Sequence, residues 1–286
     1  MASENSMECI AEELAFPEGP VVMADGSVIV VELMGGQITR CWNGRKEVIC
    51  TTGGGPNGAA IGPDGALWLC NNGGLYQTGP GTEGRIERID LATGRLERVY
   101  DACDGIALEA PNDLVFGADG RLWFTDLGTI GPNGKAFGGL YCSLADGRAI
   151  TAIKRGALSY NGVGLSPGEA HVYVADTFQA RLYRYDARVE AQEPGYVATA
   201  WGPVAFDSLA VTEAGNICVA TLFEGGITTI TPDGQMTKYP IPGEEHVTNI
   251  AFGGADMRDA YITLSGTGRL VRMRWDEPGL KLAFNG

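Results

Sequence analysis

The chain has 286 residues, of which 44% are hydrophobic, and its 35 acidic and 21 basic side chains give a net charge of −14. Such a charge repels phosphate backbones and anionic bilayers, so neither nucleic acid nor a membrane is an expected partner. No feature of the sequence indicates a protein partner, and a small-molecule substrate is expected. The length and composition suit one compact domain spanning residues 1–286.

The first ten residues, MASENSMECI, lack the basic segment and the apolar core of a secretory signal. No apolar run approaches the length of a membrane span, which makes a cytoplasmic protein the expectation. Seven cysteines are scattered along the chain without CxxC pairs. They are expected to be reduced thiols rather than zinc ligands.

Six apolar runs rich in β-branched and aromatic residues each come directly after a turn that contains Gly or Asp. In chain order they are SVIVVE (27–32), ALWLCN (66–71), RLWFTD (121–126), HVYVAD (171–176), NICVAT (216–221) and AYITLS (260–265). Turns such as ADGSV and PDGAL are typical of hairpins, so each run is expected to be the second strand of a hairpin. Apolar positions alternate with a period of two, and no long amphipathic helix is indicated. The predicted fold class is all-β.

An amide or carboxylate residue stands eight positions before the tip of each of these six turns. The six are Glu18, Asn57, Asn112, Asn161, Asp207 and Asn249, at successive spacings of 39, 55, 49, 46 and 42 residues. Such spacings are typical of propeller blades, and the first strand of each blade lines the central channel. The sequence therefore predicts a six-bladed β-propeller whose channel mouth holds six hard oxygen donors, which suits a divalent cation. Asn or Asp before a turn also bonds its own backbone, which explains single positions but not the shared register.

The ring of blades has to close, because an open sheet edge leaves backbone groups unpaired. Residues 8–14 have the pattern of a strand without a blade of its own, and the pieces RLVRMRW and LKLAF near the C-terminus need partners. The N-terminal strand is therefore predicted to pair into the last blade.

Loops at the channel mouth supply the other candidate residues. His246 lies three residues before Asn249 and is interpreted either as a substrate contact or as a solvated loop residue. Long Gly-rich loops, NNGGLYQTGPGTEG and LGTIGPNGKAFGG, follow two of the second strands and are expected to carry substrate specificity. They contain Asn72, Tyr76 and Phe137, which either bind the substrate or only shape and anchor the loops.

At these residues the chain resembles the gluconolactonase family that includes regucalcin (senescence marker protein). The resemblance rests on FPEGP (16–20), GGGPNGAAIGPDGALWLCNNGG (53–74), APNDLVFGADGRLWFTD (110–126) and VTNIAFGG (247–254), and it spans nearly the whole chain. It implies a six-bladed propeller and a divalent-metal lactonase. Carried over by motif, it implies that the metal ligands are Glu18, Asn161 and Asp207, and that Asn112 contacts metal or substrate.

For such an enzyme the cation is expected to act as a Lewis acid on the lactone carbonyl. Asp207 is predicted to be the general base for water, and Asn112 to orient the substrate or the developing oxyanion. The predicted substrate contacts are Asn57, Asn72, Tyr76, Asn112, Phe137 and His246. Oxygen donors favour calcium, magnesium or manganese, and zinc also accepts carboxylates, so calcium and zinc are the first candidates.

One position departs from the sugar-lactone hydrolases of the regucalcin type. They carry an arginine two residues before the equivalent of Asn112, and this chain has Ala110. A sugar lactone is therefore not implied as the substrate, and the PNGAA and NNGG motifs resemble a bacterial branch. Two alternatives stay open: a metal-dependent propeller enzyme acting on another bond, by phosphotriester hydrolysis or by rearrangement of a carbonyl compound, and a non-catalytic binding propeller stabilised by metal.

Overall fold

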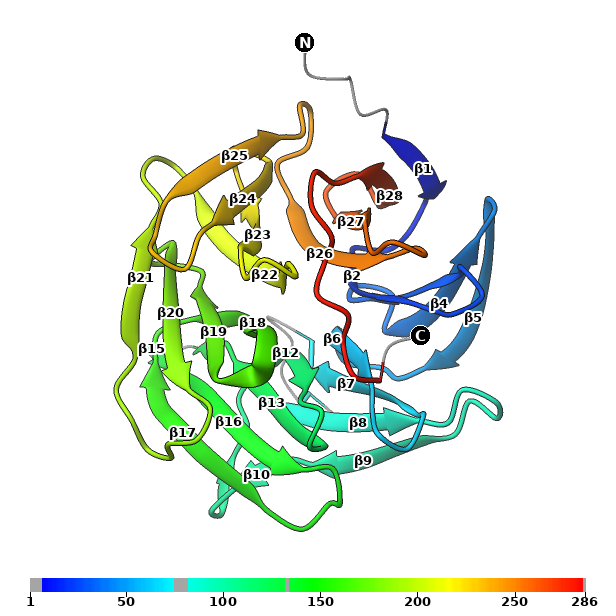
Figure 1. Ribbon diagram of the computed structural model, residues 1–286. Helices are drawn as coiled ribbons and strands as arrows, with labels where there is room; N and C mark the ends of the chain where they lie inside the picture. Colours follow the sequence, from blue (N-terminus) through cyan, green and yellow to red (C-terminus); the bar gives the residue numbers. More distant parts are fainter. Residues whose placement is uncertain (1–6, 75–81, 132–133, 285–286) are drawn as a thin grey trace.

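The structure is a computed structural model that describes residues 7–74, 82–131 and 134–284. Figure 1 shows six four-stranded antiparallel sheets arranged as a ring around a central channel. The predicted all-β, six-bladed propeller is confirmed. Within the described ranges the only helical segment is a short 3-10 helix, η1 (Pro167–Glu169), and no helix there has the length and apolarity to cross a bilayer.

The blades follow one another along the chain, and within each blade the chain runs from the innermost strand outward. Blade 1 consists of β2 (Pro17–Val22), β3 (Val28–Glu32), β4 (Gln37–Trp42) and β5 (Arg45–Thr51). Blade 2 consists of β6 (Pro56–Ile61), β7 (Leu67–Asn71), β8 (Arg85–Ile89) and β9 (Leu96–Tyr100). Blade 3 consists of β12 (Pro111–Phe116), β13 (Arg121–Asp126), β16 (Gly138–Leu144) and β17 (Ile150–Ala157).

The second half of the ring has the same order of strands. Blade 4 consists of β18 (Tyr160–Leu165), β19 (His171–Asp176), β20 (Arg181–Asp186) and β21 (Gly195–Thr199). Blade 5 consists of β22 (Ala205–Val211), β23 (Ile217–Leu222), β24 (Gly226–Ile230) and β25 (Met236–Pro240). Blade 6 consists of β26 (Val247–Gly253), β27 (Asp259–Leu264), β28 (Arg269–Arg274) and the N-terminal β1 (Glu8–Ala11).

Blade 6 closes the ring, because its outermost strand comes from the other end of the chain. β1 pairs antiparallel with β28, with Glu8 opposite Arg272 and Cys9 opposite Val271. The Glu8 carboxylate also accepts a hydrogen bond from Nε of Arg272 at 3.2 Å. The predicted closure by the N-terminal strand is confirmed.

Two faces of the propeller differ in their connections. The site face carries the loops after the second strands and the connections between blades. Two small hairpins also lie in these connections, β10 (Ala102–Cys103) with β11 (Ile106–Ala107) and β14 (Thr129–Gly131) with β15 (Gly134–Ala136). The opposite turn face carries the hairpins that follow the innermost and third strands. Each innermost strand therefore begins at the site face and ends at the turn face.

The hydrophobic core is divided among the six interfaces between adjacent blades. One cluster of buried side chains fills each interface. Between blades 2 and 3, for example, Trp68 packs edge-on against Phe116 with ring centroids 5.8 Å apart. This follows from the alternation in the sequence, because successive strand residues point to opposite faces of a blade and so into different interfaces.

The C-terminal segment crosses the turn face, where Figure 1 shows it in red over the middle of the ring. Backbone hydrogen bonds hold it to two blades, from Gly279 N to Met257 O at 2.7 Å and from Leu280 N to Val211 O at 2.9 Å. The segment LKLAF, expected to need partners, joins no sheet. Its alternate side chains pack against the interface clusters between blades 4 and 5, 3 and 4, and 2 and 3, and they are Leu280, Leu282 and Phe284.

Candidate active site

A β-bulge interrupts each innermost strand close to its site-face end. In blade 2, Pro56 pairs with Asn71 and Ala59 with Leu69, so Asn57 and Gly58 together stand opposite a single residue. The other five innermost strands shift register beside the corresponding amide or carboxylate residue that was predicted for the channel mouth. With Asn57, these six residues are called the ring residues below. A bulge breaks the side-chain alternation and re-aims the residues in it. The shared register of the sequence therefore reflects a shared local backbone.

All six ring residues are placed in these bulged segments and are buried. Their exposed fractions are 2% for Glu18, 4% for Asn57, 3% for Asn112, 4% for Asn161, 8% for Asp207 and 5% for Asn249. In two places a hydrogen bond joins a ring residue to a residue of the adjacent blade. Asn249 donates Nδ2–H to Glu18 Oε2 at 3.2 Å, and Ser208 donates Oγ–H to Asn161 Oδ1 at 3.4 Å. The structure thus brings polar groups from the first and last blades together.

Glycines allow the bulges of adjacent blades to approach closely. A Cβ added to Gly19 would lie 2.4 Å from the carbonyl oxygen of Asn57, and φ of Gly19 is +47°. A Cβ on Gly162 would lie 2.7 Å from the carbonyl oxygen of Asp207. No L-residue side chain fits at such distances without moving the next strand. The position after the ring residue is therefore a packing position.

In blade 3 this position holds Asp113, which the sequence patterns did not reveal. Asp113 is 6% exposed, and its Oδ1 accepts a hydrogen bond from the Leu114 backbone at 2.8 Å. The facing residue is Gly58, whose missing Cβ would lie 2.4 Å from Asp113 Oδ1. Glycine on one strand makes room for a carboxyl on the next, and the signal in the sequence was ND where two other blades have NG.

Three buried carboxyls therefore share the channel. Burial raises the pKa of Glu18 to about 7, with a further rise from Asp113 opposed by the hydrogen bond from Asn249. Burial raises the pKa of Asp113 to about 7. Burial and then the charge of Glu18 raise the pKa of Asp207 well above its usual value. None of the three forms an ion pair with a described residue, so the channel favours either protons or a bound cation.

Polar residues at the ends of the second strands fix the segments that lead into the ring. Glu32 accepts a hydrogen bond from Ala15 N at 2.7 Å. Asp126 accepts hydrogen bonds from Glu109 N at 2.8 Å and Ala110 N at 2.9 Å. In blade 4, Ser159 donates its hydroxyl to Asp176 Oδ1 at 2.6 Å. These hydrogen bonds, called clamps below, hold residues that lie two or three positions before Glu18, Asn112 and Asn161. In the sequence, the acidic residue that ends SVIVVE, RLWFTD and HVYVAD was the signal for them.

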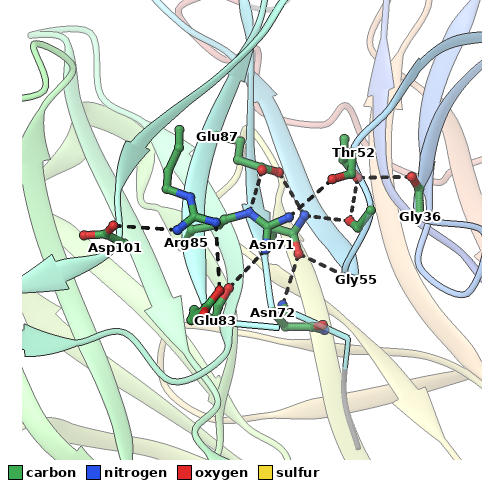
Figure 2. Close-up of polar contacts among 12 residues, drawn as sticks. Gly36, Thr52, Gly55, Asn71, Asn72, Glu83, Arg85, Glu87 and Asp101 are labelled. Carbon is green, nitrogen blue, oxygen red and sulfur yellow. Dashed lines mark hydrogen bonds and ion pairs between the residues drawn. The ribbon is translucent and has the colours of Figure 1, made fainter. Parts of the chain in front are cut away.

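In blade 2 the amide residue Asn71 occupies the end of the second strand, where blades 1, 3 and 4 have an acidic residue. Figure 2 shows the resulting hydrogen-bond network. Asn71 Oδ1 accepts hydrogen bonds from Gly55 N and Gly73 N, both at 3.0 Å. Its Nδ2 donates to Glu87 Oε2 at 2.8 Å, and Glu87 forms a buried ion pair with Arg85 at 2.6 Å. Asn71 thereby joins the segment before Asn57 to the loop that follows the second strand.

The loop residues predicted to bind substrate have different surroundings. Asn72 is 3% exposed, its Oδ1 accepts a hydrogen bond from Gly74 N at 2.9 Å, and its Nδ2 has no partner. Phe137 is on the site face and 55% exposed. His246 is half-buried, with its ring centroid 6.2 Å from that of Phe16. Tyr76 lies outside the described residues.

The donor set at the ring is mainly carboxyl and amide oxygen. Asn112 Oδ1 is buried without a hydrogen-bond partner. Asn161 donates Nδ2–H to Thr177 Oγ1 at 3.0 Å, which turns its Oδ1 toward Ser208 and away from Thr177. No three Asp, Glu, His or Cys side chains of the described segments cluster closely enough to hold a metal by themselves. Any cation at the ring therefore needs ligands of other kinds as well, and the predicted set of Glu18, Asn161 and Asp207 includes an amide.

A cavity opens at the turn-face end of the channel. It has a volume of about 690 Å³ and lies between the hairpin residues and the C-terminal segment. Met23, Met257 and Leu280 line it, and it reaches inward as far as Asp113 and Asn249. The cavity therefore connects the turn face with the ring residues.

Comparisons with known proteins identify the family. A family model described as SMP-30/Gluconolactonase/LRE-like region matches residues 16–266. The gluconolactonase of Zymomonas mobilis is 25% identical, over 94% of this chain and 81% of its own length. The pentonolactonase XacC of Haloferax volcanii is 30% identical, over 60% of this chain and 61% of its own length.

Solved structures share the fold across nearly the whole chain. A gluconolactonase from Xanthomonas campestris superposes with a TM-score of 0.79 at 22% identity, covering 95% of this chain and 90% of that one. A calcium-binding regucalcin from Agrobacterium tumefaciens gives a TM-score of 0.77 at 20% identity, covering 97% and 98%. The chain belongs to the SMP-30/gluconolactonase/LRE-like family, and the resemblance seen in the sequence is confirmed.

Proposed function

We propose that this protein is a lactonase that binds one divalent cation at the ring and hydrolyses a cyclic ester there. The observation that carries the proposal is the group of three buried carboxyls, Glu18, Asp113 and Asp207, which have no ion-pair partner among the described residues. Such groups are costly unless a cation or a proton neutralises them. The lactonase names of the relatives support the reaction class.

The ring residues fit a hard cation. Glu18, Asn161 and Asp207 would hold it, and the two carboxylates would balance its charge. The buried, unpaired Oδ1 of Asn112 offers a further oxygen toward cation or substrate. Such a cation, when bound, supplies Lewis acidity toward a carbonyl oxygen. Oxygen ligands suit calcium, and zinc is the second candidate.

The residues of this chain account for the proton movements of the reaction. The Asp207 carboxylate takes a proton from the attacking water, whose oxygen forms a bond to the lactone carbonyl carbon. The C–O single bond of the lactone then breaks, and the proton on Asp207 passes to the departing alkoxide, which gives a hydroxy acid. Asn112 orients the substrate, and Thr177 holds Asn161 by accepting its Nδ2–H at 3.0 Å.

The test combines metal content with ring opening. Purified protein is analysed for bound elements, stripped with chelator, and assayed with a pH indicator on sugar-acid and aliphatic lactones after addition of calcium, zinc, manganese or magnesium. We expect one metal per chain and ring opening that a single metal restores.

The failures of this test are separable. Protein that binds a metal but leaves every lactone intact would move the proposal to another reaction at the same site. Protein that binds none of the four metals, yet hydrolyses lactones, would remove the cation from the proposal. Protein with neither property would contradict the proposal as a whole.

A further inference from the structure

Exposed aromatic side chains gather on the site face. Five aromatic residues in the described ranges are exposed, and four of them lie in site-face loops of blades 3 to 5. These four, which we call the aromatic arc, are Phe137, Phe178, Trp201 and Phe223, with exposed fractions of 55%, 56%, 93% and 56%. The fifth, Tyr196, lies on the outer strand β21 and is 62% exposed. Exposed apolar groups that gather on one face mark a binding surface.

The loops that carry the aromatic arc are neighbours in space. Lys135, in the loop of Phe137, places Nζ 5.8 Å from the ring centroid of Phe178. Ala200, next to Trp201, donates its backbone N–H to Ala180 O at 2.9 Å. The loop of Trp201 in turn approaches the loop of Phe223, since a Cβ on Gly202 would lie 3.1 Å from Glu224 Oε1. The loops therefore follow one another around the channel mouth, in the order of the blades in Figure 1.

The aromatic arc is tied to the proposed catalytic residues. Thr177, which accepts the hydrogen bond from Asn161, directly precedes Phe178. Phe178 donates its backbone N–H to Ser159 Oγ at 2.9 Å, and Ser159 lies two residues before Asn161. Trp201 is in the segment that leads into β22, the strand that carries Asp207. The segments of Phe178 and Trp201 therefore adjoin those that carry Asn161 and Asp207.

The chemistry of this rim favours apolar surface over the hydroxyl groups of a polyol. A sugar lactone presents hydroxyl groups on most carbons, and aromatic faces offer these groups no hydrogen bonds. At position 110 the side chain is a fully buried alanine, whose backbone N–H is bound by Asp126. Aromatic rings do, however, gain from covering alkyl or aryl surface.

We infer that the substrate is a lactone with an alkyl or aryl substituent, and that this substituent lies along the aromatic arc while the ester group lies at the ring. The inference rests on the proposed function. It names a class different from the gluconolactones and pentonolactones after which the relatives are named. Phe178 and Trp201 become specificity-determining residues, because they act on the substituent and not on the reacting atoms.

The experiment compares γ-valerolactone, γ-decalactone and glucono-1,5-lactone on the metal-loaded protein. We expect kcat/KM to rise from the short to the long alkyl lactone and to be lowest for gluconolactone. Phe178→Ala and Trp201→Ala should each lower kcat/KM for γ-decalactone about tenfold, because each removes contact with one aromatic ring, and should leave γ-valerolactone within about twofold. Tyr196→Ala is the matched control and should change neither value.

Binding of γ-decalactone and of phosphatidylcholine vesicles to the protein is also measured by calorimetry. Turnover without preference for the alkyl chain, or equal losses for all lactones in the arc variants, would overturn the inference and leave the proposed function standing. Binding of γ-decalactone that Trp201→Ala weakens, without turnover of any lactone, would support the arc as an apolar ligand site and overturn the proposed function. Vesicle binding that depends on Trp201, with no binding of γ-decalactone, would overturn the inference in favour of a membrane-docking surface.

Discussion

The two ends of the channel are built from the same six strands and differ in almost every respect. At the site-face end each strand is bulged, and Glu18, Asp113 and Asp207 are buried without ion-pair partners in the described residues. At the turn-face end the pairing is regular, as between Val21 and Ile29, and the C-terminal segment packs apolar side chains across the opening. The costly polar groups of this fold are thus gathered at the ring residues, where they can bind a ligand, while apolar packing dominates toward the turn face.

Replacing Asp207 should give the largest effect and isolate chemistry at the site-face end. Asp207→Asn keeps the size of the side chain but removes the proton acceptor, so kcat should fall about a thousandfold. Elemental analysis should show retained metal, because an amide oxygen can still serve as a ligand. A thermal melt in chelator should show an unchanged or higher melting temperature, because a costly buried carboxyl is lost. Asp259→Asn, at the turn face and paired with Arg274 at 2.7 Å, is the control and should keep full activity. Wild-type kcat in Asp207→Asn would remove Asp207 as the base.

Replacing a glycine by alanine should lower the free energy of unfolding more beside the ring residues than in a turn-face hairpin. A Cβ on Gly58 would lie 2.4 Å from Asp113 Oδ1 and 2.5 Å from Asp113 Cα, so Gly58→Ala should destabilise by about 3 kcal/mol. Gly65, in a turn-face hairpin, has open space around its Cβ position and φ of +74°. Gly65→Ala should therefore cost only the left-handed strain of about 1 kcal/mol. Denaturant unfolding compares the two, and equal losses would contradict the close packing of the ring.

The buried carboxyls predict a pH effect that the turn face lacks. The pKa of Asp113 is raised from 3.8 to about 7 in the folded chain, so folding takes up a proton between these values. Its contribution to stability is full below the lower value and is lost as the pH rises through the higher one.

In chelator, the melting temperature of the wild type should therefore fall between about pH 5 and about pH 8, by roughly 5 °C more than that of Asp113→Asn. Asp25→Asn is the turn-face control, because hydrogen bonds from Ser27 lower the pKa of that carboxyl. Parallel profiles for the wild type and Asp113→Asn would show that Asp113 is ionised in both states.

The smallest expected effect concerns the orientation of Asn161. Thr177→Val removes the oxygen that accepts its Nδ2–H at 3.0 Å. One neutral hydrogen bond of this kind contributes on the order of 1 kcal/mol, so kcat/KM should fall about fivefold. Thr212→Val, which removes a hydroxyl that accepts Asn216 N–H at the turn-face end, is the matched control and should affect stability alone. Equal kcat/KM in the two variants would mean that Thr177 does not position Asn161.

Much of this fold follows from local sequence patterns. The register of Glu18, Asn57 and the other ring residues with the turns predicted six blades, and the unpaired strand pattern at residues 8–14 predicted the closure. Both depend on short-range chemistry, namely hairpin turns and alternating strands. The aromatic arc was predicted only at Phe137, because Phe178, Trp201 and Phe223 lie in separate loops that only the packing of consecutive blades brings together.

The missed part of the site depends on contacts between blades. Asp113 follows Asn112 directly, and its burial is decided by Gly58 on the next blade, which leaves room for a carboxyl. The amide clamp of Asn71 depends on Glu87 and Arg85, which follow a loop of more than ten residues. The roles of Glu18, Asn161 and Asp207 at a metal stay predictions, since sequence and geometry restrict the ligands without naming the ion.

The hydrogen bond between Asn249 and Glu18 has a consequence for folding during synthesis on the ribosome. The two residues are 231 positions apart, and they belong to the last and first blades. At roughly 5 to 20 residues per second, a ribosome needs about 10 to 45 seconds to add Asn249 after Glu18. Throughout that interval the nascent chain carries an incomplete ring and an open sheet edge, so the channel is assembled only when synthesis is nearly over.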